Sequence, residues 1–221
     1  MIRLYVLCEG QTEESFVNTV IAPHLATFNI ATTAPLLGKP GHKGGNVSWA
    51  RVLTDIKILL RDRQAHVTSF LDYYGIDQAF PGRSTSASIT ALKAQAIGDA
   101  MRTALDDQRV EGAGRFIPYI QMYEFEGLLF SDPAILARSM GAASKERELK
   151  AVMDGFATPE DINDGRATAP SKRVLRIYDR YQKVQHGTIA AKQLGLPIIR
   201  THCPLFDAWV RRLETLSTPV S

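Results

Sequence analysis

The strongest constraint on the fold is an abrupt change of pattern near the N-terminus. An apolar run that starts at Ile2 ends in Glu9 and Gly10, and apolar residues at helical spacing then extend from Phe16 to Leu25. This pattern predicts a buried strand, a tight turn that carries an acid, and an amphipathic helix. A carboxylate at the end of a parallel strand lies where α/β sheets hold their ligands. Glu9 is therefore the first candidate for a functional residue.

Strand and helix patterns continue to alternate along the chain. The main expected elements are helices at 48–63 and 89–106 and strands at 67–71 and 115–122. This alternation predicts an α/β fold with a mostly parallel, Rossmann-like sheet and helices on both faces. From residue 144 onward the pattern is mainly helical. We therefore expect an α/β domain at 1–143 and a helical C-terminal extension at 144–221, packed on that domain.

Composition limits the kinds of protein that this chain can be. With 221 residues, 45% of them hydrophobic and 22% charged, it can bury a core. No apolar run approaches the roughly 20 residues of a membrane span, and the first residues lack a signal-peptide pattern. Two cysteines are too few for a disulfide framework, and a net charge of +3 is mild. We therefore expect a cytoplasmic protein with reduced thiols.

Three expected strand ends carry acids. Glu9 follows the first strand, Asp72 a middle one, and Glu124 with Glu126 a later one. The carboxyl ends of parallel strands lie at one edge of a sheet, so these side chains can converge. Clustered carboxylates repel one another and lose solvation, which favours a bound cation. Hard oxygen ligands suit Mg²⁺ or Mn²⁺, which can activate water for attack on a phosphoryl group.

The same residues carry a family resemblance. The string from Glu9 to Glu13 after a hydrophobic strand, with an aspartate at a later strand end, resembles the Toprim domain. That domain is the metal-binding module of topoisomerases, primases and OLD (overcoming lysogenization defect) nucleases. Nearly end to end, the chain is similar to the bacterial Toprim-like domain-of-unknown-function family 4276. The motifs that carry this similarity include Asp72-Tyr73-Tyr74-Gly75, Pro118-Tyr119-Ile120-Gln121, Glu124-Phe125-Glu126-Gly127, Pro159-Glu160-Asp161-Ile162-Asn163, Pro170-Ser171-Lys172-Arg173 and Cys203-Pro204.

The resemblance implies a Toprim-type fold and a Mg²⁺- or Mn²⁺-dependent nuclease acting on DNA or RNA. Members of the family are often encoded beside an ATPase in bacterial defence loci. We therefore expect an effector of anti-phage defence that works with an ATPase partner. The sequence leaves open whether the chain forms a homodimer and whether the ATPase is required for cleavage.

The resemblance also assigns roles to individual acids. Glu9 matches the Toprim glutamate that binds metal and takes part in proton transfer, and Glu13 matches the second acid of the OLD-type string. Asp72 matches the first aspartate of the Asp-x-Asp turn, but Tyr74 stands where the second belongs. Glu124 or Glu126 is expected to supply the missing carboxylate, with Glu124 favoured. The number of metal ions, one or two, remains open.

Basic residues give further candidates. Lys172 is expected to neutralise charge at the reacting phosphate. We interpret 172–183 as one helix, whose basic side chains could bind a nucleic-acid backbone; a solvated helix face is the alternative. The glycine-rich loop that contains Lys39 and Lys43 could also bind along a phosphate backbone. The expected nucleic-acid-binding residues are Lys39, Lys43, Arg173, Arg176, Arg180 and Lys183. His186 could act as a general acid or a neighbour of the metal, but a lone histidine is more often structural.

A second function remains open at this point. The chain could be a nucleic-acid-binding or regulatory subunit that keeps the Toprim shape without turnover, and Tyr74 is the feature that favours this reading. A phosphotransferase would need a nucleotide site, and the sequence contains no Walker-type spacing. The two remaining functions differ in whether a divalent ion binds and supports cleavage.

Overall fold

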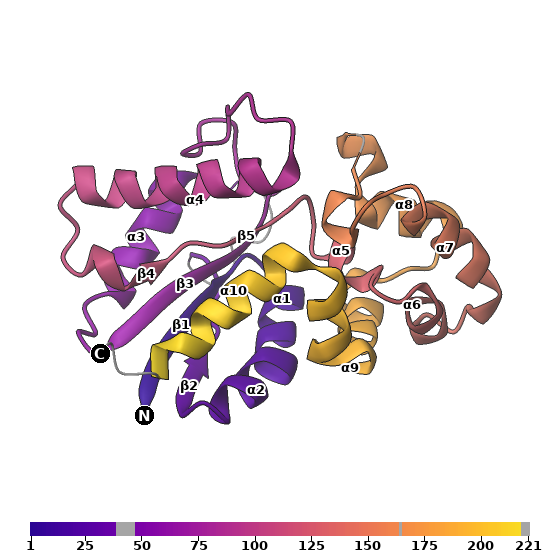
Figure 1. The fold of residues 1–221 in the computed structure, drawn as a ribbon, viewed down its shortest axis with the longest axis horizontal. Coiled ribbons are helices and arrows are strands. Elements are labelled where there is room, and N and C mark those ends of the chain that lie inside the picture. Colours follow the sequence, from indigo (N-terminus) through magenta and orange to yellow (C-terminus); the bar gives the residue numbers. More distant parts are fainter. Residues whose placement is uncertain (39–46, 164, 218–221) are drawn as a thin grey trace.

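A parallel five-stranded sheet lies in one half of the protein, and the other half is mainly helical (Figure 1). The structure is a computed structural model that describes residues 1–38, 47–163 and 165–217. The strand order is β2-β1-β3-β4, and β5 also pairs with β3. The strands are β1 (Ile2–Cys8), β2 (Ile30–Thr33), β3 (Ala65–Asp72), β4 (Phe116–Ile117) and β5 (Ile120–Gln121). All of these pairings are parallel, which confirms the expected α/β sheet.

Helices cover both faces of the sheet, as the sequence predicts. The α-helices are α1 (Gln11–Phe16), α2 (Ala22–Ala26), α3 (Trp49–Leu59), α4 (Thr90–Asp107), α5 (Glu126–Leu129), α6 (Pro133–Ser139), α7 (Glu146–Met153), α8 (Pro170–Ile177), α9 (Lys183–His202) and α10 (Pro204–Glu214). On one face, α1, α2 and α10 pack in a core that contains Val6. On the other, α3 and α4 pack in a core that contains Leu7. Successive strand residues thus point to opposite faces.

The register of the two central strands brings the expected acids to one edge. β1 pairs with β3 from Arg3 opposite Ala65 to Cys8 opposite Phe70. Glu9 directly follows β1, and Asp72 is the last residue of β3. Because the strands are parallel and in this register, both acids lie at the carboxyl edge of the sheet.

The strand expected at 115–122 is divided in two. β4 and β5 flank Pro118, which has no backbone N–H to donate to the ladder. A side chain of β3 bridges the gap: Ser69 Oγ donates to the carbonyl of Tyr119 at 2.8 Å and accepts from its N–H at 3.1 Å. The proline therefore bends the strand just before the segment that carries Glu124 and Glu126.

The last helix lies directly on the sheet. The indole N–H of Trp209 in α10 donates to Thr68 Oγ1 in β3 at 2.9 Å, and its ring stacks on Phe70 with centroids 5.4 Å apart. Buried Glu160 accepts hydrogen bonds from the backbone N–H groups of Leu205 and Phe206, which caps α10. One hydrophobic core therefore contains residues from both sides of the expected domain boundary at 143.

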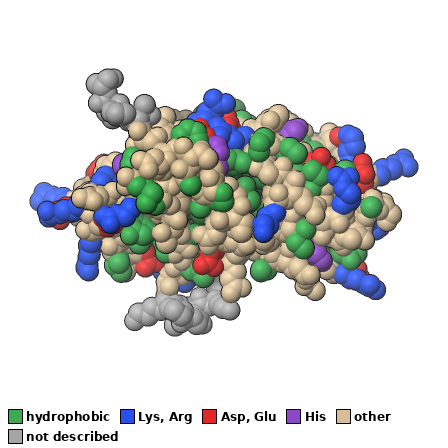
Figure 2. Space-filling model, turned by 90° about the horizontal axis from the view of Figure 1, so that it is seen from below, with side chains coloured by type: hydrophobic (Ala, Val, Ile, Leu, Met, Phe, Trp, Pro, Cys, Tyr) green, Lys and Arg blue, Asp and Glu red, His purple; other side chains and the backbone are tan. Residues whose placement is uncertain are grey.

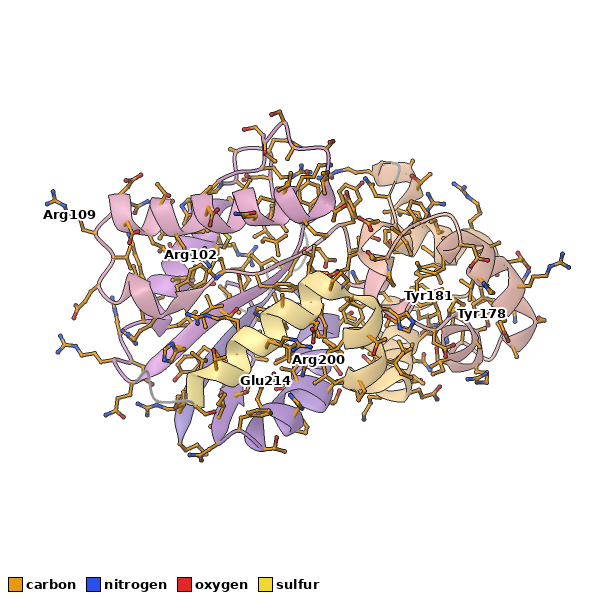
Figure 3. All side chains as sticks on the ribbon, in the orientation of Figure 1. Arg102, Arg109, Tyr178, Tyr181, Arg200 and Glu214 are labelled. Carbon is orange, nitrogen blue, oxygen red and sulfur yellow. The ribbon has the colours of Figure 1, made fainter. Side chains whose placement is uncertain are left out.

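Charged side chains also join the two C-terminal helices. Arg200 of α9 and Glu214 of α10 point toward one another and form an ion pair (Figure 3). Asp207 of α10 also forms an ion pair with Arg200, and both of these side chains are partly buried. Among the described helices, none has the length and apolar character that a bilayer crossing requires.

Candidate active site

Carboxylates from separate elements surround one lysine at the carboxyl edge of the sheet. The Nζ of Lys183, the first residue of α9, lies 3.2 Å from Glu126 Oε2, 3.4 Å from Asp72 Oδ2 and 3.8 Å from Glu13 Oε1. The three acids come from α5, β3 and α1 and are buried. The Lys183 side chain is 40% exposed, so part of it faces solvent while its ammonium group lies against the buried acids.

Glu9 adjoins this cluster and is held by the turn after β3. Its Oε2 accepts a hydrogen bond from the backbone N–H of Asp72 at 3.2 Å. A methyl group on Gly75 would overlap the Glu9 carboxylate, within 2.6 Å of its Cδ. The close approach of backbone and carboxylate therefore requires glycine at position 75.

Asp72 is fixed by the backbone that follows β5. Its Oδ1 accepts the N–H of Phe125 at 2.8 Å. Tyr123, two residues earlier, has a φ of +61°, in the left-handed region that bulky residues rarely adopt. Its carbonyl accepts the N–H of Tyr74 at 3.0 Å. This strained turn brings the Phe125 N–H to Asp72.

Burial and mutual repulsion change the acidity of the cluster. Burial raises the pKa of Glu9 to about 7, and the nearby Glu13 carboxylate acts in the same direction. Burial likewise raises the pKa of Asp72 well above its usual value, against the opposing effect of Lys183. For Lys183, burial favours the neutral form, but the carboxylates around it, Asp72 and Glu126 foremost, raise its pKa above the usual value. The ammonium therefore stays charged.

The donor set fits a hard divalent cation in its chemistry. The acids supply only oxygen donors, and they outnumber the one ammonium among them. Burial is the main cause of the raised pKa of Glu9 and of Asp72, and the neighbouring carboxylates add to it. In the part of the chain that the structure describes, however, no three His, Cys, Asp or Glu side chains are grouped closely enough to hold an ion as they stand. A cation would therefore have to draw the acids inward.

Of the two acids after β5, the structure brings Glu126 rather than Glu124 into contact with Lys183. Glu124 Oε2 instead accepts the backbone N–H of Ser171, near the start of α8, at 2.8 Å. Both acids could face the site only on an extended backbone, but Phe125 already has helical torsion angles and leads into α5. The two side chains therefore diverge.

Tyr74 points away from the acids. Its hydroxyl hydrogen-bonds to Asn163, and Arg166 donates to its carbonyl oxygen at 3.0 Å. Its ring lies beside those of Tyr73 and Tyr123. Tyr74 thus joins the sheet edge to the segment before α8 and supplies no charge to the site.

The single helix expected at 172–183 is wrong. α8 ends at Ile177, Tyr178 is extended with a φ of −140°, and α9 begins at Lys183. Tyr178 and Tyr181 lie in the connection between these two helices (Figure 3). The break turns Lys183 toward the acids, so it does not share a stripe with the arginines that precede it.

The other basic candidates lie in different surroundings. Lys172 is exposed on α8, and Arg176 and Arg180 are also exposed. Arg173 donates to the carbonyl of Thr168 at 2.7 Å and covers the ring of Phe156. On the face seen in Figure 2, the described Lys and Arg side chains lie apart, mainly toward the ends of the molecule. Lys39 and Lys43 fall outside the described residues.

His186 supports the start of α9. Its Nδ1 accepts the backbone N–H of Gln182 at 2.9 Å, and its ring lies near those of Tyr178 and Tyr181. This bond satisfies a donor that the first turn of a helix leaves free. Because His186 holds the backbone of Gln182, it also helps to position the next residue, Lys183.

Sequence reasoning missed the positions of Lys183 and Gly75 in the site. Lys183 was expected to bind nucleic acid from the same helix as Lys172, because helical spacing was extended across residues 178–182. Gly75 gave a usable signal, since a glycine three residues after a strand-end acid often marks a close backbone approach. The break between α8 and α9 had no comparable local marker.

The fold and its edge define the class: a parallel α/β protein with an acidic site at the carboxyl ends of its strands. The chain belongs to the family described as Domain of unknown function (DUF4276), whose sequence model matches residues 8–214. The expected family is thereby confirmed.

Comparison with solved structures gives distant similarities. The C-terminal region of the Burkholderia pseudomallei OLD protein is 14% identical, with 97% of this chain and 99% of that chain covered and a TM-score of 0.49. The C-terminal region of the Xanthomonas campestris pv. campestris OLD protein is 15% identical, with coverage of 97% and 95% and a TM-score of 0.43. Comparison with curated proteins gives no match.

Proposed function

We propose that this protein is a divalent-metal-dependent nuclease of Toprim type that hydrolyses phosphodiester bonds. The observation that carries the proposal is the convergence of Glu13, Asp72 and Glu126 around the Lys183 ammonium, with Glu9 bonded to the backbone of Asp72 beside them. Oxygen donors suit Mg²⁺ or Mn²⁺, and an ammonium group suits a phosphate group. The site lies at the edge of a parallel sheet where α/β proteins bind ligands.

The residues of the site can divide the work of hydrolysis. Glu9, with a pKa of about 7, can accept a proton from water near neutral pH. The Lys183 ammonium can stabilise the negative charge that develops on a phosphoryl oxygen. Held by Glu9, Glu13 and Asp72, Mg²⁺ or Mn²⁺ would supply Lewis-acid polarisation of the phosphoryl group. Asp72 keeps its orientation through the Phe125 N–H.

The family resemblance also suggests a cellular role for this nuclease. We infer a cytoplasmic effector of anti-phage defence that acts on nucleic acid and works with an ATPase encoded nearby. The second candidate is a regulatory or nucleic-acid-binding subunit without turnover. Two observations favour it: Tyr74 supplies no carboxylate, and Lys183 already neutralises part of the acidic cluster.

Cleavage assays decide between the two candidates. Purified protein is incubated with plasmid, single-stranded DNA and transfer RNA, in Mg²⁺, Mn²⁺ or EDTA, with and without the neighbouring ATPase. The nuclease proposal expects cleavage that requires the divalent ion. Nucleic-acid binding without cleavage under every condition would instead establish the regulatory subunit.

Metal binding is expected to strengthen as the pH rises from 6 to 8. Glu9 must lose its proton to bind a cation, and with a pKa of about 7 it is mainly protonated at pH 6 and mainly ionised at pH 8. The apparent Mn²⁺ affinity should therefore rise about tenfold over this range. Thermal melting with graded Mn²⁺ measures this change. Equal stabilisation at both pH values would contradict the assignment, and Glu9→Gln should flatten the pH dependence.

Gly75→Ala is expected to lower cleavage about 10²-fold without lowering the melting temperature appreciably. The new methyl group would displace the flexible Glu9 carboxylate, and small misplacements of a catalytic group are costly. Gly114→Ala is the matched control, because its methyl group would meet no atom within 4 Å. Cleavage rates and melting curves of both variants test this. An active Gly75→Ala protein would show that Glu9 need not occupy its present position.

A further inference from the structure

Lys183 contacts the acids in the manner of a bound cation. Its Nζ lies 3.2–3.8 Å from one oxygen each of Glu126, Asp72 and Glu13. A surface ion pair joins two side chains, whereas here three buried carboxylates from three elements share one charge. Glu126 is fully buried, so its carboxylate depends on this charge for compensation.

The preferences of the helix itself do not explain this placement. Lys183 is the first residue of α9, where the helix dipole disfavours a positive charge. The contacts with Glu126 and Asp72 offset that cost. The bond from the Gln182 N–H to His186 Nδ1 fixes the first turn, and therefore the backbone from which the ammonium reaches the acids.

The remaining donors lie on the side of Glu9. Glu9 receives the Asp72 N–H, and a methyl group on Gly10 would lie 3.1 Å from Glu13 Oε2, so these carboxylates border the turn after β1. Tyr74, two residues beyond Asp72, offers only a phenol that is bonded to Asn163. A second divalent ion, on the side of Glu126, would lie close to the ammonium, and like charges repel strongly at that range.

We propose that Lys183 is a built-in cation that takes the place of one divalent ion, so that the site binds a single Mg²⁺ or Mn²⁺ on the side of Glu9. This inference rests on the proposed function, because it assumes that the acids bind a divalent ion. According to this inference, Lys183 determines how many divalent ions the site binds.

Counting bound Mn²⁺ tests the inference without an activity assay. Full-length protein, freed of metal with EDTA, is titrated with Mn²⁺ by calorimetry, and free Mn²⁺ is followed by electron paramagnetic resonance. We expect one ion per wild-type chain and two per Lys183→Met chain, because the variant leaves Glu126, and the Asp72 and Glu13 oxygens that faced the ammonium, without a cation. Lys192→Met, exposed on the same helix, is the matched control and should keep one ion. Lys183→Arg retains the positive charge and should also keep one.

The outcomes separate the inference from the function on which it rests. Two ions in the wild type, or one ion in a folded Lys183→Met chain, would overturn the inference while leaving a metal-dependent nuclease intact. If Lys183→Met fails to fold, the wild-type and Lys183→Arg counts still decide, since two ions in either would overturn it. A wild-type chain that binds no Mn²⁺ and cleaves nothing would remove the proposed function itself.

Discussion

Replacing Glu9 with glutamine is expected to lower metal-dependent cleavage by about 10²–10⁴-fold, the range that a positioned acid–base group contributes. Glutamine has nearly the same size and can still accept the Asp72 N–H, so the turn after β1 keeps its contacts. It loses the charge that would hold a cation and the proton that titrates with a pKa of about 7. The loss should therefore appear in the chemical step and in metal affinity, and the fold should be retained.

Single-turnover rates at saturating Mn²⁺ measure this effect, and melting curves without metal check the fold. Glu14→Gln is the matched control, because Glu14 lies on the same helix as Glu13 and carries the same charge. The control should retain activity within about twofold. Undiminished cleavage by Glu9→Gln would exclude Glu9 from the reaction, and cleavage in EDTA would exclude the metal.

Trp209→Ala is expected to cost about 3–5 kcal/mol in the free energy of unfolding, the usual price of removing a buried aromatic ring. The ring lies between α10 and the sheet, stacks on Phe70 and Tyr119, and bonds to Thr68. Removing the ring leaves a cavity between α10 and the sheet, and Thr68 Oγ1 loses the hydrogen bond that it accepts from the indole N–H. Urea denaturation, followed by circular dichroism, measures the change.

Trp209→Phe separates the two contributions. Phenylalanine can keep the stack on Phe70 but cannot donate to Thr68, so we expect a smaller loss of about 1–2 kcal/mol. A Trp209→Ala protein that unfolds within 1 kcal/mol of wild type would show that α10 contributes little to the core. The 144–221 segment would then behave as a separable extension, and the expected packing on the α/β domain would contribute little to stability.

The expected positions of Glu9 and Asp72 came from strand patterns alone, and the structure places both at the carboxyl edge of the sheet. This worked because a buried strand is marked by its own residues, and parallel strands end at the same edge. Sequence patterns do not establish whether the chain after β5 is extended or helical, so they cannot separate the roles of Glu124 and Glu126. The left-handed backbone at Tyr123 and the helical torsion angles of Phe125 set the directions of these two side chains.

Hydrophobic periodicity is a local property, so the residue pattern was enough to predict the parallel sheet, the helices on both faces and the acids at the strand ends. The cation that meets those acids could be identified only from the packing of distant elements. Lys183 is 111 residues from Asp72 along the chain, and its contact depends on where α8 stops and how α9 packs. The contact between Gly75 and the Glu9 carboxylate and the contact between Trp209 and β3 likewise depend on how separate elements pack. Spacing along a chain specifies the face of one element, whereas contacts between distant elements are set by how all the layers pack together.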